Sequence, residues 1–289
     1  GLFFLFFLVL FFSNKNLNFK MTNLTYSGEN NFMSEENIKN IILKILIFYS
    51  VISFILLMFL TFSGLRLFNS LNLSMTIVSA GGFLPTENLK DIILTNFQKI
   101  VLILGLIFSM LNFYFLFNIF NKKKIFNEHK EDFYLLSLST IFIILIYFID
   151  FDIFNLIISV ISSLSNSGIT LVQEDKNLSL YFLFLTIIGG SLISNTSGIK
   201  LGRFYILLKI TSAEIFKLIS PNSVINKTIF NSEEKITDDY VKISFLIFIS
   251  FFISLFILSA FLVLDNIGFE TSFKLSILAL TNTVNSEMY

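Results

Sequence analysis

The sequence predicts an all-α polytopic membrane protein, with repeated units of helix, re-entrant half-helix and filter loop, and helix around a central pore. Three observations support this prediction. Of the 289 residues, 55% are hydrophobic and 14% charged, and the mean hydropathy is +0.81. Several apolar runs reach the roughly 20 residues that a helix needs to cross a bilayer core of about 30 Å. Shorter apolar runs lead into turns of small polar residues, and this pattern recurs along the chain.

The composition excludes an ordinary soluble enzyme, and the residue inventory narrows the chemistry further. Without cysteine the chain has no disulfide and no thiolate metal site, and one histidine cannot form a zinc cluster. The spans hold no convincing paired Asp, Ser with Lys, or metal-binding His. We therefore expect neither an enzyme nor a cofactor, and no nucleic-acid partner. His129, in a lysine-rich loop, is expected to be solvated and to have no role.

Four apolar runs are predicted to span the bilayer, and three shorter runs are predicted to be half-helices. The spans are residues 41–62, 100–120, 133–149 and 243–264. The half-helices, each about three turns and too short to cross, are residues 67–78, 154–164 and 271–280, and a further apolar run, residues 178–188, enters a small polar stretch. The chain opens at Gly1 inside a further apolar run that lacks the basic start of a signal peptide. We therefore expect a fragment that begins within a helix.

The spans and the turns keep a regular spacing. The separations are 20, 19 and 21 residues, from Phe62 to Gly82, from Ile149 to Gly168 and from Leu264 to Asn285. Such regularity indicates an internal repeat. Because a bilayer tolerates irregular backbone only where it lines a watery cavity walled by protein, the turns predict a pore.

The distribution of cations predicts the orientation. Residues 13–44, 121–135 and 199–242 hold 15 of the 20 Lys and Arg residues. Cytoplasmic loops near helix ends carry the excess of these residues. We therefore expect these three segments inside the cell and all the filter-like turns at the outer face.

Two kinds of turn are candidate functional sites. A filter needs inward carbonyls, and glycine permits the required dihedrals. The pair Gly81 and Gly82 fits this need, although a lone glycine pair is more typical of an ordinary loop. Its recurrence at Gly168 favours the filter. Residues 189–198 are small and polar where a helix should continue, which fits either close helix packing or a chain unwound into a cavity.

Several motifs resemble the TrkH family of bacterial potassium-uptake proteins. The family has a GGxxGSTxGGIKxxRF loop, followed by LLK, E, RL and HPNAV, and this chain is similar at residues 189–204, 207–209, 214, 217–218 and 221–224. Its filter motifs STIxIGGFS, TTxGFT and ATLNNLG resemble residues 76–83, 162–170 and 279–285.

The resemblance implies a four-repeat pore, from the end of repeat 1 to the filter of repeat 4. Residues 1–40 would be the end of repeat 1 and a cytoplasmic loop. Residues 41–120 would be repeat 2, and residues 133–219 repeat 3 with an intramembrane gate loop at 189–198. Residues 220–242 would be a cytoplasmic loop, and residues 243–289 an incomplete repeat 4.

The resemblance also implies the site residues. Potassium, the only metal expected, would be bound in the filter by Ser79, Ala80, Gly81, Gly82, Ser165, Asn166, Ser167, Gly168, Asn282 and Thr283. The gate loop would consist of Gly189, Gly190, Ser191, Ser194, Asn195, Thr196, Ser197 and Gly198, flanked by Lys200 and Arg203.

Departures from the family pattern, and the setting of the two basic residues, complete the prediction of the site. The sequence departs from the family pattern at Ile169, where Phe is usual, in the triplet Ser165 to Ser167, and at Asn285, where the fourth filter has Gly. From the residues alone, Lys200 and Arg203 fit an amphipathic helix at the membrane interface, with lysines that extend to the headgroups.

By this resemblance the chain takes up potassium across the bacterial inner membrane, as the pore-forming subunit of a Trk-type system. Its partners would be the lipid bilayer, a second copy in a homodimer and a cytosolic nucleotide-binding regulatory ring. Family members are often described as symporters of K⁺ and H⁺, which no residue here indicates. The alternatives are a non-conducting scaffold derived from the family and a Na⁺-selective relative.

Overall fold

A computed structural model describes residues 38–85, 89–113, 115–116, 129–148, 152–171, 179–220, 228–231 and 236–283. The regular elements in these ranges are all helices, which confirms the predicted fold class. The longer helices are α3 (Ile38–Phe62), α5 (Asn96–Met110), α8 (Lys130–Tyr147), α11 (Leu201–Ile219) and α12 (Asp238–Leu264). The shorter ones are α4 (Leu67–Ser79), α9 (Ile153–Leu164), α10 (Ser179–Ile188) and α13 (Phe269–Leu280), with 3-10 turns η2 (Leu89–Asp91) and η3 (Ile229–Asn231).

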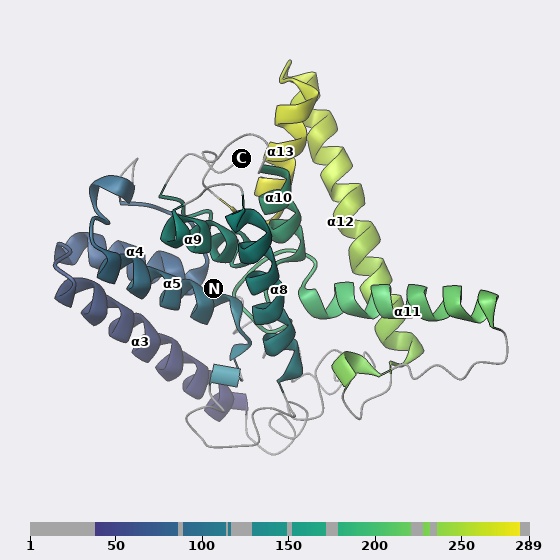
Figure 1. Ribbon diagram of the computed structural model, residues 1–289, viewed down its shortest axis with the longest axis horizontal. Coiled ribbons are helices and arrows are strands. Elements are labelled where there is room, and N and C mark those ends of the chain that lie inside the picture. Colours follow the sequence, from purple (N-terminus) through teal and green to yellow (C-terminus); the bar gives the residue numbers. More distant parts are fainter. Residues whose placement is uncertain are drawn as a thin grey trace.

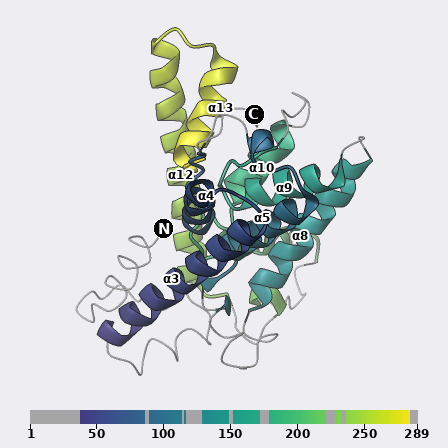
Figure 2. The same ribbon diagram turned by 90° about the vertical axis from the view of Figure 1, so that its left-hand side faces the viewer.

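The helices form three neighbouring groups (Figure 1). Helices α3, α4 and α5 pack together at one side, α8, α9 and α10 form the middle, and α12 with α13 forms the other side. Helix α9 joins the first two groups through α5, and α10 contacts α13. Helix α11 leaves the middle group across the lower part of α12 (Figure 1). In the turned view, α12 and α13 extend beyond the other helices (Figure 2). The half-helices α4, α9 and α13 therefore belong to three different groups.

Local sequence signals explain where α5 begins. The Thr95 hydroxyl accepts the Gln98 N–H at 3.3 Å, and Gln98 Oε1 accepts the Thr95 N–H at 3.1 Å, which is a reciprocal capping box. Gln98 Nε2 also donates to the Ser63 carbonyl at 3.0 Å. One side chain thus starts α5 and fixes it to the end of α3.

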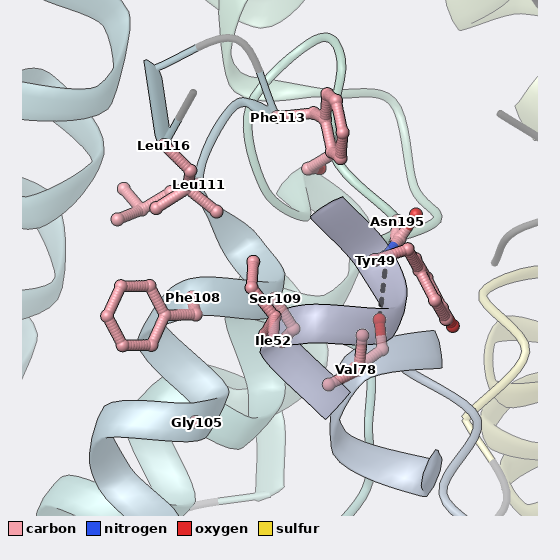
Figure 3. A pocket seen from close by; sticks show the side chains of 11 residues that line it. Tyr49, Ile52, Val78, Gly105, Phe108, Ser109, Leu111, Phe113, Leu116 and Asn195 are labelled. Atoms are coloured by element: carbon pink, nitrogen blue, oxygen red, sulfur yellow. Dashed lines mark hydrogen bonds between the residues drawn. The ribbon is translucent and has the colours of Figure 1, made fainter. Parts of the chain in front are cut away.

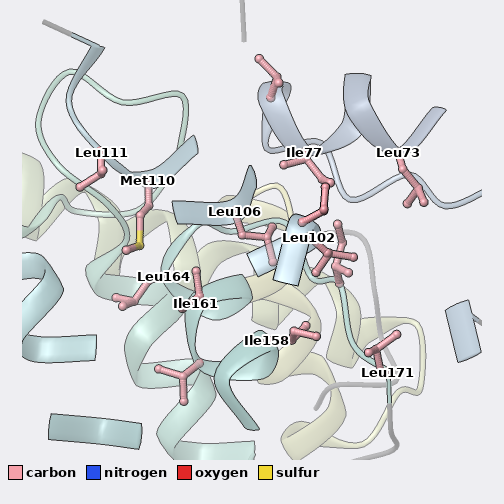
Figure 4. Close-up of a cluster of buried hydrophobic side chains, with 14 of the residues drawn as sticks. Leu73, Ile77, Leu102, Leu106, Met110, Leu111, Ile158, Ile161, Leu164 and Leu171 are labelled. Carbon is pink, nitrogen blue, oxygen red and sulfur yellow. The ribbon is translucent and has the colours of Figure 1, made fainter. Parts of the chain in front are cut away.

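The apolar core runs through α5 between α4 and α9 (Figure 4). Leu102 and Leu106 of α5 are fully buried, as are Ile77 of α4 and Ile158 of α9. A Cβ on Gly105 would lie 2.9 Å from Ile77 Cγ2, so this glycine allows α4 and α5 to approach closely.

Apolar side chains also cover the outside of the molecule. On α12 the exposed fractions of Phe256 and Phe261 are 58% and 63%, and on α3 that of Phe54 is 58%. Within the described ranges, α12 is the helix long and apolar enough to cross a membrane. The stretches Leu46–Phe62, Asn96–Met110 and Ile153–Leu164 are shorter apolar helices.

The predicted span at residues 100–120 is not one continuous helix, because it is interrupted at Leu111 and Asn112, and residues 114 and 117–120 lie outside the described residues. Helix α5 ends at Met110, and the next residue, Leu111, has extended backbone. The Asn112 N–H donates to Asp132 Oδ1 at 2.8 Å, and the Phe113 N–H donates to the Ile193 carbonyl at 2.9 Å. These two distant acceptors replace the helical ones. Of the predicted end of repeat 1, residues 1–37 lie outside the described residues.

Candidate functional site

The half-helices α4, α9 and α13 end in turns with the same hydrogen-bond pattern. One residue in each turn has left-handed backbone, with φ of 52° at Ala80, 55° at Asn166 and 54° at Asn282. Its N–H donates to the carbonyl three residues back, and the next N–H donates to the carbonyl five residues back. We name these segments the α4 turn (residues 79–83), the α9 turn (residues 165–169) and the α13 turn (residues 281–283).

Two residues after each left-handed residue, the α4 and α9 turns have a glycine with positive φ. The values are 69° at Gly82 and 64° at Gly168. In the α13 turn this register leads to Val284, one residue before the Asn285 that the spacing of the spans suggested. Both residues lie outside the described residues.

Paired hydroxyl groups support this register. Ser165 Oγ and Ser167 Oγ lie 2.9 Å apart, and Thr281 Oγ1 and Thr283 Oγ1 also lie 2.9 Å apart. Both pairs flank the left-handed asparagine of their turn. Asn166 and Asn282 are therefore equivalent positions.

In two turns, several backbone carbonyl groups receive no hydrogen bond from the described part of the chain. No described residue donates a hydrogen bond to the carbonyl oxygens of residues 80–82 in the α4 turn or residues 165–168 in the α9 turn. Carbonyl oxygens of this kind replace the hydration shell of a monovalent cation in a filter. The predicted filter residues thus supply suitable ligands through their backbone.

The side-chain oxygens of the α9 turn are engaged within the protein instead. The hydroxyl of Ser167 lies 3.0 Å from that of Ser162, in addition to its pair with Ser165. Asn166 Nδ2 donates to the Thr186 carbonyl of α10 at 2.9 Å. These side chains are at most 1% exposed. These side chains therefore fix the α9 turn to α9 and α10.

A hydroxyl in the last turn of two half-helices ties the helix to the exit of its turn. Thr76 Oγ1 donates to the Phe83 carbonyl at 2.6 Å. Ser162 Oγ accepts the Ile169 N–H at 2.7 Å. The two hydroxyl groups occupy the same register, seven residues before their partners. The sequence analysis missed this role, although the positions lie in the motifs it quoted.

The chain is unwound between α10 and α11, as one of the two alternatives predicted. We name residues 189–200 the α10–α11 loop. At its end the N–H groups of Ile199 and Lys200 donate to the carbonyls of Ile187 and Ile188, at 2.9 and 2.8 Å. The loop therefore leaves α10 and returns to it before α11 begins.

Three glycines allow the loop to fold against itself and its neighbours. A Cβ on Gly189 would lie 2.2 Å from the Ser197 carbonyl oxygen. A Cβ on Gly190 would lie 2.6 Å from the Met110 carbonyl oxygen, and one on Gly198 would lie 2.8 Å from that of Ile187. Gly189 and Gly198 also have positive φ, 70° and 84°.

The loop lies against the ends of α4 and α5. Asn195 Nδ2 donates to the Val78 carbonyl at 2.6 Å, beside a small pocket lined by α3, α5 and the loop (Figure 3). The Ser191 N–H donates to the Met110 carbonyl at 3.0 Å. The loop is thus joined to the helix that leads into the α4 turn.

Glu131 ties the α10–α11 loop to the start of α11, a role that the sequence analysis missed. Its Oε1 accepts the N–H of Leu192 at 3.1 Å and that of Gly202 at 2.9 Å, and the residue is 2% exposed. The available signal was an acidic pair, Glu131 and Asp132, in the first turn of an apolar span, where ionisable residues are costly.

Lys200 does not extend to a membrane interface, contrary to the amphipathic interpretation. It is 5% exposed, and its backbone has φ 78°, which costs a non-glycine residue about 1–3 kcal/mol. Its Nζ contacts oxygens of Ser194 and Thr196. Arg203 is partly buried, and its Nη1 donates to the Ile199 carbonyl at 3.3 Å. Both residues therefore form hydrogen bonds with the α10–α11 loop.

His129 is buried rather than solvated, so that prediction is wrong. It is 4% exposed, its ring packs at 5.4 Å from that of Phe115, and its Nδ1 lies 3.8 Å from Asp132 Oδ2. Burial lowers the pKa of His129 to about 4. The ring is therefore neutral at pH 7.

No family model matches the chain, but the chain is similar to individual known proteins. An uncharacterized cation transporter of Methanocaldococcus jannaschii is 32% identical over 190 residues, 64% of this chain and 38% of that protein. The crystal structure of the potassium transporter TrkH from Vibrio parahaemolyticus matches with a TM-score of 0.78 at 14% identity, over 86% of this chain and 57% of that chain. The chain has the TrkH fold. It spans only part of the length of either protein.

Within this TrkH fold the predicted site residues gather in two places. The filter residues lie in the α4, α9 and α13 turns, and the gate residues lie in the α10–α11 loop. The loop contacts both sides, because Asn195 bonds to Val78 and the Cβ position of Gly189 lies 3.2 Å from Asn166 Oδ1. The resemblance seen in the motifs is confirmed at the level of the fold.

Proposed function

We propose that the chain is the pore-forming part of a cation transporter, a multi-pass protein of the bacterial inner membrane that takes up potassium. The α4, α9 and α13 turns bind the ion through backbone oxygens, and the α10–α11 loop blocks the path toward the cytoplasm. The observation that carries the proposal is the shared turn at the ends of three half-helices, with carbonyl groups in two of them to which no described residue donates a hydrogen bond.

Two further findings support the proposal. The crystal structure that matches this fold is that of a potassium transporter, and the relative from Methanocaldococcus jannaschii is described as a cation transporter. The exposed phenylalanines of α3 and α12 suit a lipid environment.

The membrane potential can drive such uptake. One unit charge that crosses 100 mV gains about 2.3 kcal/mol, so no catalytic group is needed for accumulation. By the same resemblance we propose a homodimer, a cytosolic nucleotide-binding ring and coupling to protons as properties of the complete transporter.

Rubidium uptake tests the proposal directly. The complete gene product that contains these residues would be expressed in a bacterium deficient in K⁺ uptake, with Gly168→Val as the inactive control. We expect growth at low potassium and uptake of ⁸⁶Rb⁺, both lost in the variant. Immunoblots of membrane fractions would show that both proteins reach the membrane.

Other outcomes favour the alternatives. A protein that reaches the membrane but restores neither growth nor uptake would support the non-conducting scaffold. Uptake of ²²Na⁺ in preference to ⁸⁶Rb⁺ would support a sodium-selective relative. The position equivalent to Gly82 and Gly168 in the α13 turn is Val284 rather than a glycine. Because selectivity depends on all the filter strands, this difference makes the comparison of ions informative.

A further inference from the structure

The buried ammonium group of Lys200 is surrounded by neutral oxygens of the α10–α11 loop. Its Nζ lies 3.0 Å from Ser194 Oγ, 2.9 Å from Thr196 Oγ1 and 3.3 Å from the Ser194 carbonyl oxygen. It also donates to the Thr196 carbonyl oxygen. Two hydroxyl and two carbonyl oxygens thus form a cage around one nitrogen.

The hydrogen atoms of the cage can be assigned. Ser194 Oγ donates to the Ser191 carbonyl at 2.7 Å, so the hydrogen shared between Ser194 and Thr196, at 2.7 Å, comes from Thr196. Neither hydroxyl has a hydrogen left for Nζ. The nitrogen must therefore be the donor in these contacts, which suits an ammonium group whose three N–H bonds are shared among the four oxygens.

The hydrogen-bond partners of this group are neutral. Among the described residues, no carboxylate oxygen forms a salt bridge with Lys200. The carboxylate of Glu131 acts on the ammonium only from beyond salt-bridge distance, and its Oε1 accepts the N–H groups of Leu192 and Gly202. A buried cation whose direct ligands are neutral oxygens has the coordination of a monovalent ion in a filter.

The cage stands next to the proposed ion path. Asn195, which lies between the two cage residues in sequence, bonds to the last turn of α4. The start of the loop meets Asn166 of the α9 turn, because a Cβ on Gly189 would lie 3.2 Å from Asn166 Oδ1. An ion that leaves the turns toward the loop therefore approaches the same oxygens.

We propose that the Lys200 ammonium closes the α10–α11 loop by filling an oxygen cage suited to a monovalent cation, so that a permeating ion competes with it for these oxygens. Lys200 is a positioning residue in this scheme. When the ammonium leaves, Ser194 and Thr196 lose one of the donors that hold the middle of the loop, while the Gly190 N–H still donates to Thr196 Oγ1. The part that concerns permeation rests on the proposed function, whereas the cage itself does not.

Thallium in crystals tests the cage independently of transport. Lys200→Met keeps an apolar stem and removes the ammonium, whereas Lys217→Met, at an exposed residue paired with Glu214, serves as the matched control. We expect an anomalous Tl⁺ peak between Ser194 and Thr196 in Lys200→Met and none there in the wild type or the control. A variant loop that stays closed around an empty cage would overturn the proposal.

Ion flux in proteoliposomes tests the permeation part. Loss of charged hydrogen bonds shifts the closed loop toward open by about tenfold or more, so ⁸⁶Rb⁺ flux through Lys200→Met should rise by about tenfold over the wild type. The control Lys217→Met should keep the wild-type flux. Equal flux in Lys200→Met and the wild type would overturn the closing role of Lys200.

A second variant covers the case in which Lys200→Met does not fold. Thr196→Val retains the shape of the side chain and removes one cage hydroxyl, so it should raise the flux in the same direction without creating a Tl⁺ site. Unchanged flux would count against the proposal. If the wild type itself conducts no ion, the proposed function fails, and the Tl⁺ result still decides whether the cage exists.

Discussion

The α4 and α9 turns have the same backbone and opposite side-chain support. In the α4 turn a hydroxyl donates to the carbonyl of Phe83, whose ring is 69% exposed. In the α9 turn a hydroxyl accepts the N–H of Ile169, which is fully buried. The helix cap and the positive-φ glycine therefore set the shape of the turn, and the hydroxyl fixes its exit in either direction. Their response to substitution should differ accordingly.

The largest effect should follow a substitution that breaks the shared backbone. Gly168→Val places a β-branched residue at φ 64°, which costs about 1–3 kcal/mol before any clash. We expect loss of ⁸⁶Rb⁺ flux and a lower unfolding temperature in detergent. We expect the same loss of flux and the same lower unfolding temperature in Gly82→Val. A fully active Gly168→Val would show that the α9 turn tolerates valine, the residue that the chain has at the equivalent position, Val284.

The next effect separates the two hydroxyl ties. Ser162→Ala leaves the buried N–H of Ile169 without an acceptor, at a cost of about 1–3 kcal/mol. Thr76→Val removes a donor from a carbonyl nearer the surface, and we expect about 0.5–1.5 kcal/mol. Chemical denaturation in detergent would measure both, with Ser250→Ala on the exposed face of α12 as control. Equal losses of stability in Ser162→Ala and Thr76→Val would contradict the expected effect of burial.

A smaller effect tests the left-handed residue itself. Asn166→Gly retains the conformation and loses the bond to Thr186, whereas Asn166→Ala also adds left-handed strain of about 1–2 kcal/mol. We expect Asn166→Ala to unfold at the lower temperature. Ala80→Gly, which removes the same strain from the α4 turn, should not lower the unfolding temperature. The reverse order for the two Asn166 variants would contradict the assigned cap.

The smallest effect is expected at Gly81. Its added Cβ would lie 3.0 Å from Ser79 Oγ, a hydroxyl that can rotate away, so Gly81→Ala should change stability by about 0.5 kcal/mol or less. Gly189→Ala is the contrast, because its Cβ would lie 2.2 Å from a backbone oxygen. Thermal unfolding of both variants checks this pair, and a large loss in Gly81→Ala would show that the α4 turn is packed more tightly than its neighbours indicate.

The sequence predicted the half-helices closely because their apolar runs and breaks are local signals. The predicted residues 67–78 and 154–164 became α4 and α9 with changes of one residue. The end of α5 could not be predicted, because Asn112 and Phe113 find acceptors 20 and 80 residues further along the chain.

The same reason explains the errors at charged residues of the site. Lys200 looked like an interfacial lysine, since a sequence shows its charge and not the four oxygens that accept its hydrogens. His129 looked solvated beside its lysines, because the ring of Phe115 and the carboxylate of Asp132 meet it only after folding. Burial of polar groups depends on partners from other segments.

One atom described above, Glu131 Oε1, accepts one N–H from Leu192 in the α10–α11 loop and one from Gly202 in α11. The stretch from Leu192 to Gly202 is thus tied at both ends to one point, so its middle can change shape while these ends stay in place. Once the bond from Asn195 to the Val78 carbonyl breaks, Asn195 can move without a movement of α10 or α11. Only a few residues then have to move. Loop motions of that size take nanoseconds to microseconds, whereas movements of whole helices are slower.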